Sequence, residues 1–155
     1  LSISLSSSLF SACNDLDSFR FHVNKGTVID KDNNLIWKRC SIGSQWQDNN
    51  GCVGMPEMMY FEEALHFAQK EGNKWRLPSI KELDSITEQD CSPIINTRIF
   101  DDMKNFHKFA PFWSSTFLAE MPNYVYYVDY IQKQLDIHSK GYSMFVRLVK
   151  SKKDD

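Results

Sequence analysis

Two serines, a histidine and two aspartates lie close together in the sequence, and these residue types supply the nucleophile, the base and the orienting acid of many hydrolases. They are Ser114, Ser115, His107, Asp101 and Asp102. Glycines flank neither serine, whereas the nucleophile turn of an α/β-hydrolase carries them. Such residue types are common in any chain, so we expect no catalytic residues and no enzymatic activity.

The histidines do not have the spacing of a metal site, because a structural zinc ion takes two close pairs of cysteine or histidine ligands. The four histidines are scattered singly: His22, His66, His107 and His138. The tripeptide Met-Pro-Asn at 121–123 has the proline of a lectin calcium loop but lacks the carboxylate that calcium prefers. We therefore expect no metal and no other cofactor.

The cysteines are typical of a protein that folds in an oxidising compartment. Cys40 and Cys52 flank a loop rich in glycine, asparagine and glutamine, and a disulfide between them would stabilise the fold by about 3 kcal/mol. Cys13 and Cys91 can bond to each other, or Cys13 can carry a lipid while Cys91 stays a buried thiol. Sequence alone does not choose among the possible pairings.

Residues 1–18 are expected to be a leader or an N-terminal extension. Leu1 to Phe10 is an uncharged stretch of serine, leucine and isoleucine, similar to the second half of a secretory leader. The small residues before Cys13 resemble the processing site of a bacterial lipoprotein, in which that cysteine is lipidated. We therefore expect an extracytoplasmic location (periplasm, outer membrane or cell surface), with the membrane contacted only through such an anchor.

Charge is nearly balanced, with 18 Lys+Arg, 20 Asp+Glu and a formal net charge of −2. A chain of this kind has no strong field to attract nucleic acid, and we expect no nucleic-acid partner. Three lysines near the C-terminus, Lys150, Lys152 and Lys153, are followed directly by two aspartates. This predicts a charged, solvated tail over residues 151–155.

The elements expected over residues 19–150 form one α+β domain. A hairpin over 21–37 turns at the Asp/Asn-rich segment 30–34. A first helix is expected from Pro56 to Gly72, and a second from Ser79, which makes a capping box with Glu82. An irregular segment follows over 96–111. The remainder is predicted to be strands at 112–116, 124–130, 134–138 and 144–149.

Several short motifs in this order resemble one bacterial family. They are GTVID at 26–30, LIW at 35–37, the Cys40–Cys52 loop with Trp46, WRLPSIKEL at 75–83, FWSST at 112–116 and VRLV at 146–149. Together they are similar to the domain of unknown function numbered 1566, which forms the C-terminal domain of the Legionella collagen-like adhesin. The resemblance covers roughly residues 20–150.

The resemblance implies a C-type-lectin-like fold, with two short helices, antiparallel sheets and long loops. It also implies a non-catalytic binding module outside the cytoplasm that recognises a glycan or polysaccharide, as an adhesin does. The alternative is a module that binds another protein of the cell envelope. Neither the ligand nor the oligomeric state follows from the sequence.

A basic patch is expected to be the ligand site for an anionic polysaccharide. Its candidates lie in the irregular segment and on the late strands: Lys104, Lys108, Lys133, Lys140 and Arg147. Arg147 has a second interpretation, shared with Arg76. An arginine that alternates with Phe145 and Val149 in a strand is also typical of buried hydrogen bonds to carbonyl groups or to a carboxylate.

Overall fold

The computed structural model describes Cys13, Asp15, Leu16 and residues 19–155. Its N-terminal strands are β1 (Phe21–Asn24), β2 (Thr27–Asp30), β3 (Leu35–Lys38), β4 (Gln45–Gln47) and β5 (Gly51–Val53). Helices α1 (Phe61–Glu71), α2 (Ile80–Ser85) and the 3-10 helix η1 (Asp101–Asn105) follow. The chain ends with β6 (Pro111–Leu118), β7 (Met121–Asp129), β8 (Gln134–Ser139), β9 (Val149–Ser151) and a 3-10 turn, η2 (Lys152–Asp154). No helix among the described residues has both the length and the apolar character needed to cross a bilayer.

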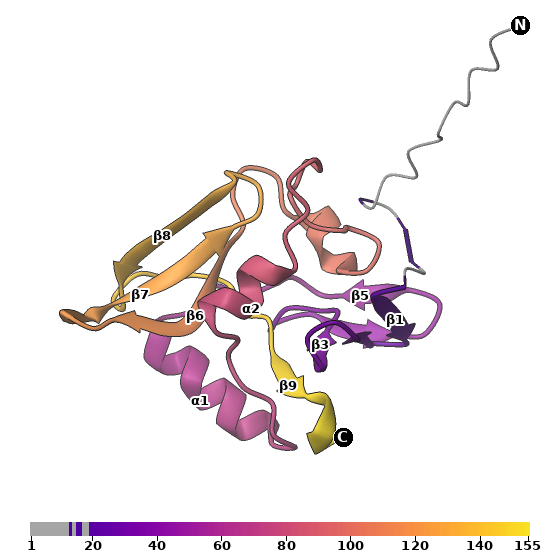
Figure 1. Cartoon of the computed structure of the whole chain (residues 1–155), viewed down its shortest axis with the longest axis horizontal. Coiled ribbons are helices and arrows are strands. Elements are labelled where there is room, and N and C mark those ends of the chain that lie inside the picture. Colours follow the sequence, from indigo (N-terminus) through magenta and orange to yellow (C-terminus); the bar gives the residue numbers. More distant parts are fainter. Residues whose placement is uncertain (1–12, 14, 17–18) are drawn as a thin grey trace, which may run out of the picture.

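The predicted mixture of two helices with antiparallel sheets is confirmed. One sheet has the order β1-β2-β3-β9, a second β6-β7-β8, and β4 pairs with β5. All strand pairs are antiparallel. Figure 1 shows the β6–β8 sheet and the β1–β3 sheet at opposite ends of the molecule, with α2 between them and α1 beside the β6–β8 sheet.

Two hydrophobic clusters hold these parts together. The first joins Trp37 of β3, Leu83 of α2, Phe100 and Phe112. The second packs α1 against the β6–β8 sheet, where the rings of Phe61 and Trp113 meet edge-on at 5.6 Å. Because each short helix is stabilised mainly by its buried face, neither would be stable without these contacts.

The final segment, residues 144–149, connects both sheets, although it was expected to be one continuous strand. It makes single bridges from Met144 to Met59, from Phe145 to Phe112 and from Val149 to Arg76. Only its end, β9, pairs with β3. A chain that bonds to four different segments in turn cannot keep the regular ladder of one strand.

Helix α1 begins at Phe61, later than the predicted start near Pro56. The Met59 amide donates to the Met144 carbonyl at 2.9 Å, and the Met144 amide donates back at 3.1 Å. This pair keeps residue 59 extended, so the helix can begin only after it. The second helix begins as predicted: Ser79 accepts from the Glu82 amide at 3.2 Å, and the Glu82 carboxylate accepts from the Ser79 amide at 2.7 Å.

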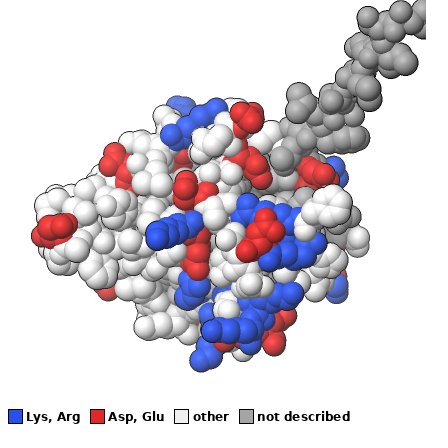
Figure 2. Space-filling model, viewed as in Figure 1, with Lys and Arg blue, Asp and Glu red and all other residues white. Residues whose placement is uncertain are grey.

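Lys152 and Lys153 are exposed, as expected for a solvated tail, whereas Lys150 just before the tail is not. Lys150 is buried and its Nζ lies 2.8 Å from the carboxylate of Asp155. The Lys152 amide donates to the carbonyl of Asn34, which attaches the tail to the β2–β3 turn. On the face drawn in Figure 2, basic side chains gather around β9, whereas the far end of the β6–β7 hairpin shows an acidic side chain at its tip and mostly uncharged residues behind it.

Candidate functional site

A groove of about 700 Å³ separates the disulfide-closed loop from helix α1. Its walls come from the β1–β2 turn, the end of β3, the loop residues 40–46, Glu57, and the side of α1 that carries Phe67 and Glu71. This volume is within the range of ligand pockets in proteins, roughly 300–1,000 Å³. Because these segments are distant in sequence, only the folded chain forms the groove.

The groove wall combines aromatic and ionisable side chains. Trp46 and Phe67 line it, together with the carboxylates of Glu57 and Glu71 and the ammonium of Lys38. Lys38 Nζ lies 2.5 Å from Glu71 Oε1, so these two charges neutralise each other. Phe67 is 41% exposed on α1, although its ring is apolar.

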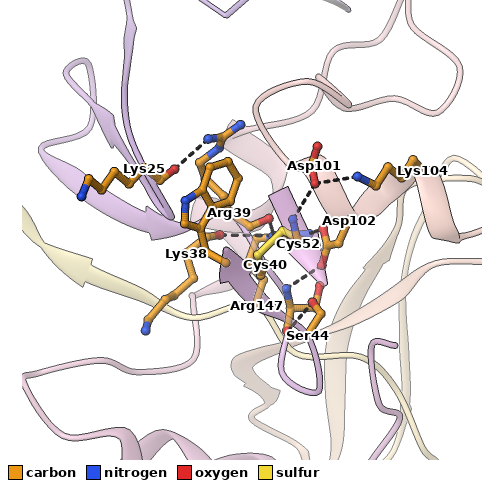
Figure 3. Close-up of a disulfide and its surroundings, with 12 residues drawn as sticks. Lys25, Lys38, Arg39, Cys40, Ser44, Cys52, Asp101, Asp102, Lys104 and Arg147 are labelled. Carbon is orange, nitrogen blue, oxygen red and sulfur yellow. Dashed lines mark hydrogen bonds and ion pairs between the residues drawn. A yellow bond between two sulfur atoms is a disulfide. The ribbon is translucent and has the colours of Figure 1, made fainter. Parts of the chain in front are cut away.

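The disulfide between Cys40 and Cys52 closes the loop that forms one wall, as the sequence suggested. Two adjacent carboxylates of η1 accept hydrogen bonds from backbone amides of this loop. Asp101 accepts from the Cys52 amide at 2.7 Å, and Asp102 accepts from the Ser41 amide at 2.5 Å. Figure 3 shows the disulfide with both aspartates beside it.

Arg147 connects Asp102 to the end of β3 and is fully buried. Its guanidinium donates to Asp102 at 2.6 Å and to the carbonyls of Lys38 and Arg39 at 3.2 and 2.6 Å. The sequence offered two interpretations of Arg147. The buried hydrogen bonds to carbonyls and a carboxylate are confirmed, and its place among the surface ligand candidates is corrected, because no part of its side chain reaches solvent.

Arg39 supports the aromatic side of the groove. Its guanidinium donates to the carbonyls of Ile99, Lys25 and Arg98, at 2.7, 2.7 and 2.9 Å. The same group lies 4.1 Å from the centre of the Trp46 ring. A cation held in this position stabilises the ring by a cation–π interaction and fixes its orientation.

The remaining lysine candidates do not form one patch. Lys104 pairs with Asp101 at 2.9 Å. Lys108 and Lys133 are neighbours, since the side chain of Gln132 donates to the Lys108 carbonyl. Lys140 lies at the other end of β8, roughly 20 Å from Lys133 for a strand of this length, and its Nζ is 5.1 Å from the Phe61 ring centre.

Cys13 forms a disulfide with Cys91. This is one of the two alternatives that the sequence left open. The other alternative, a lipid on Cys13, would need the same sulfur atom for its thioether bond. The rest of the leader-like segment lies almost wholly outside the described residues.

The hydrolase-like residues have structural partners. The Ser114 hydroxyl donates to the Tyr126 carbonyl at 2.6 Å, and Asp102 is bound to Arg147. Among the residues that the structure describes, no group of three or more histidine, cysteine, aspartate or glutamate side chains could hold a metal ion.

The sequence interpretation missed Ser41, Glu57 and Phe67 as groove residues. Phe67 carried a usable signal, because it is a large apolar residue outside the buried stripe of α1, whose core members are Phe61, Ala64 and Ala68. Ser41 and Glu57 carried none, since a single serine and a single glutamate in loops are ordinary surface residues.

Acid should weaken the support of the disulfide loop through Asp101. Burial alone would raise the pKa of Asp101, but hydrogen bonds from the Cys52 amide and Lys104, with the charges of Lys104 and Arg39, lower it overall. A carboxyl whose pKa is lowered by folding stabilises the fold above its unfolded value, near 4, and loses that contribution as pH falls through the folded value. We expect the free energy of unfolding to decline below about pH 4.

The variant Asp101→Asn tests this expectation by denaturant unfolding as a function of pH. It should cost about 1 kcal/mol at neutral pH, since an amide is the weaker acceptor, and should flatten the decline in acid. Asp84→Asn, at an exposed position on α2 without an ion pair in the described part of the chain, is the control. An unchanged acid slope in Asp101→Asn would contradict the assignment.

Comparison with known proteins gives one match. The sequence model of the Lcl C-terminal domain matches residues 26–150, which is more than half of the chain. No curated protein and no solved structure matches. The matched range contains both walls of the groove and the Arg147–Asp102 pair. Because the match covers most of the sequence, the chain belongs to the Lcl C-terminal domain family.

Proposed function

We propose that this domain is a non-catalytic, extracytoplasmic binding module of adhesin type that holds part of a glycan in the groove between the disulfide loop and α1. One observation carries the proposal: the groove presents aromatic rings, Trp46 and Phe67, beside carboxylates in a recess of about 700 Å³. Sugars offer apolar ring faces for stacking and hydroxyl groups for hydrogen bonds, so a site for them needs both kinds of surface.

The rigidity of the groove supports the same proposal. A disulfide closes the loop that forms one wall, and Asp101 and Asp102 bind backbone amides of the same loop. Arg39 fixes the orientation of the Trp46 ring. A preorganised site loses little conformational entropy when a ligand binds, which matters for weak, solvent-exposed sugar sites.

Two disulfides among the described residues support an oxidising compartment outside the cytoplasm. We also propose that the mixture of antiparallel sheets, two helices and long loops is a C-type-lectin-like fold, as the resemblance of the family implies. The family membership and the groove are together the basis for an adhesin-like role.

A protein partner is the second candidate, and a separate observation favours it. The end of the β6–β7 hairpin exposes Phe117, Met121 and Tyr124 by 56%, 45% and 40%. Apolar groups gathered on a projecting hairpin are typical of protein–protein contacts. This surface is distinct from the groove, so the two candidates can be tested separately.

Replacing Phe67 should separate groove binding from general adhesion. The measurement is binding to an array of immobilised glycans, with calcium and with chelator. Phe67→Ala is expected to weaken binding by about ten-fold or more, because loss of a stacking aromatic costs roughly 1–3 kcal/mol of binding free energy. Phe109→Ala is a matched control, since Phe109 is similarly exposed at 48% but lies outside the groove.

Equal binding by the two variants would contradict the groove as the glycan site. A blank array with folded, disulfide-intact protein would contradict the glycan proposal. In that case, retention of a protein partner by the wild type and its loss in Phe117→Ser would favour the hairpin surface. Loss of binding on chelation would contradict the expectation that no metal takes part.

A further inference from the structure

The tip of the disulfide-closed loop carries the pair Asn50–Gly51, and no other asparagine of this sequence is followed by glycine. The pair lies where the turn after β4 meets the start of β5. Asparagine is among the chemically labile residues of proteins. Its side-chain carbonyl carbon can react with the main-chain nitrogen of the next residue, and a next residue without a Cβ leaves that nitrogen uncrowded.

The structure leaves the side chain of Asn50 accessible. Asn50 is exposed and Gly51 is half-buried. The Asn50 side-chain nitrogen lies 3.5 Å from the Gln47 side-chain oxygen, a long hydrogen bond that restrains the amide group only weakly. Water therefore reaches the amide group, and the side chain is free to rotate toward the nitrogen of Gly51.

The turn can open while the rest of the domain stays folded. β4 and β5 have three residues each and form a sheet of two strands. Gln47 and Gly51 are its last pair before the turn. A two-stranded sheet is marginally stable, so its turn end opens locally. The disulfide between Cys40 and Cys52 keeps the base of the loop closed during such opening.

We infer that Asn50 is a site of deamidation, with water as the only other reactant. The Gly51 main-chain nitrogen forms a bond to the side-chain carbonyl carbon of Asn50, and the bond from that carbon to the side-chain nitrogen breaks. Ammonia leaves with the proton that the Gly51 nitrogen gives up, and a cyclic imide remains. Water then adds to either ring carbonyl, and the ring opens to aspartate or to isoaspartate, whose main chain runs through the former side chain. Nothing is oxidised or reduced.

The isoaspartate product fits the loop poorly. Its main chain is longer by a CH2 group, so Gly51 must move relative to its partner Gln47. Gly51 packs directly against the carboxylate of Asp101, where an added Cβ would overlap an oxygen atom. The same carboxylate accepts from the Cys52 amide, so a shift of Gly51 disturbs that hydrogen bond. Both products also add a negative charge to a turn that already carries Asp48. Deamidation is therefore expected to loosen the groove wall that this loop forms.

Peptide mapping by mass spectrometry tests the site in the folded, disulfide-intact protein. The protein is kept for days in mildly alkaline buffer, which favours loss of the proton from the Gly51 nitrogen, and in mildly acidic buffer. The peptide that contains Asn50 should gain the mass that separates a carboxyl group from an amide, faster in the alkaline buffer. Asn73 is the internal control, since it is exposed with a positive φ but precedes lysine. Conversion of Asn50 should be at least about ten-fold faster than conversion of Asn73.

Melting temperature tests the consequence for the loop. The aged wild type should melt a few degrees lower than the fresh protein. Asn50→Gln should keep its melting temperature over the same period, because the longer side chain closes an imide ring far more slowly. Fresh Asn50→Asp adds the charge without lengthening the main chain, so its melting temperature should lie between those of the fresh and the aged wild type.

Three outcomes would contradict parts of the inference. Conversion of Asn50 in urea-unfolded protein but not in folded protein would overturn the site, because the fold would then keep the turn closed. Equal rates at Asn50 and Asn73 would overturn the role of Gly51. Conversion that leaves the melting temperature unchanged would retain the site and overturn its effect on the groove wall.

Discussion

Arg147→Met is expected to lower the free energy of unfolding by about 3–5 kcal/mol, which is the usual cost of breaking a buried ion pair from one side. The substitution leaves the carboxylate of Asp102 buried without its cation, and it removes the donor that the carbonyls of Lys38 and Arg39 share. Methionine fills a similar volume, so the loss of charge and hydrogen bonds dominates the effect.

This cost is large relative to a typical domain stability of about 5–15 kcal/mol. Arg147 also lies 4.8 Å from the Phe100 ring centre, between aromatic side chains of the main cluster. The variant is therefore expected to loosen both the core and the base of the groove. Chemical denaturation of the disulfide-intact protein, followed by tryptophan fluorescence, measures the change.

Arg76→Met is the matched control. Arg76 forms a similar pair with Glu82 at 2.7 Å, but its side chain is 45% exposed, so solvent screens the interaction. The control should cost less than about 1 kcal/mol. A double variant, Arg147→Met with Asp102→Leu, should regain part of the stability lost by Arg147→Met, because no unpaired charge remains. Equal costs for the two arginine variants would refute the assigned role of Arg147.

Removal of the Cys13–Cys91 disulfide should have the second large effect. These cysteines are 78 residues apart. A cross-link across so long a loop lowers the conformational entropy of the unfolded chain and so raises the free energy of unfolding by about 4 kcal/mol. The variant with both cysteines changed to alanine should therefore lose about that amount. The Cys40–Cys52 bond spans 12 residues, for which the expected loss is smaller, about 3 kcal/mol.

The two disulfides should differ in their effect on binding. The pair Cys40→Ala and Cys52→Ala releases a wall of the groove and is expected to weaken glycan binding in the folded protein. The pair Cys13→Ala and Cys91→Ala leaves the groove walls intact, so binding should persist. Mass spectrometry of the unreduced protein checks the pairing directly: a lipid or a free thiol at Cys13 would show that the Cys13–Cys91 bond is not formed.

Much of the secondary structure followed from local signals. The Asp/Asn-rich segment 30–34 marked the turn between β2 and β3, although the earlier turn at residues 25–26, between β1 and β2, was missed. The Ser79–Glu82 capping box marked the start of α2. The strands from residue 112 to residue 139 were identified within a few residues of their observed ends. These signals depend on neighbours one to four positions apart, so they are readable without the fold.

Signals that depend on distant partners were not readable. The start of α1 is set by the hydrogen bonds between Met59 and Met144, and the last segment is divided among four partners. The alternation of side chains along a strand placed Arg147 on the same face as Phe145 and Val149. Only the packing of the folded chain decided that this face is buried and that Arg147 pairs with Asp102.

The sequence by itself determined the family, the antiparallel sheets with two helices, and the use of cysteine for cross-links. Tertiary structure decided the second disulfide, the burial of Arg147, the separation of the candidate lysines, and the groove where Ser41, Glu57 and Phe67 meet. The physical reason is the range of the interactions. Turn chemistry and capping act over a few residues, whereas burial, charge pairing and the shape of a groove are properties of segments that only folding brings together.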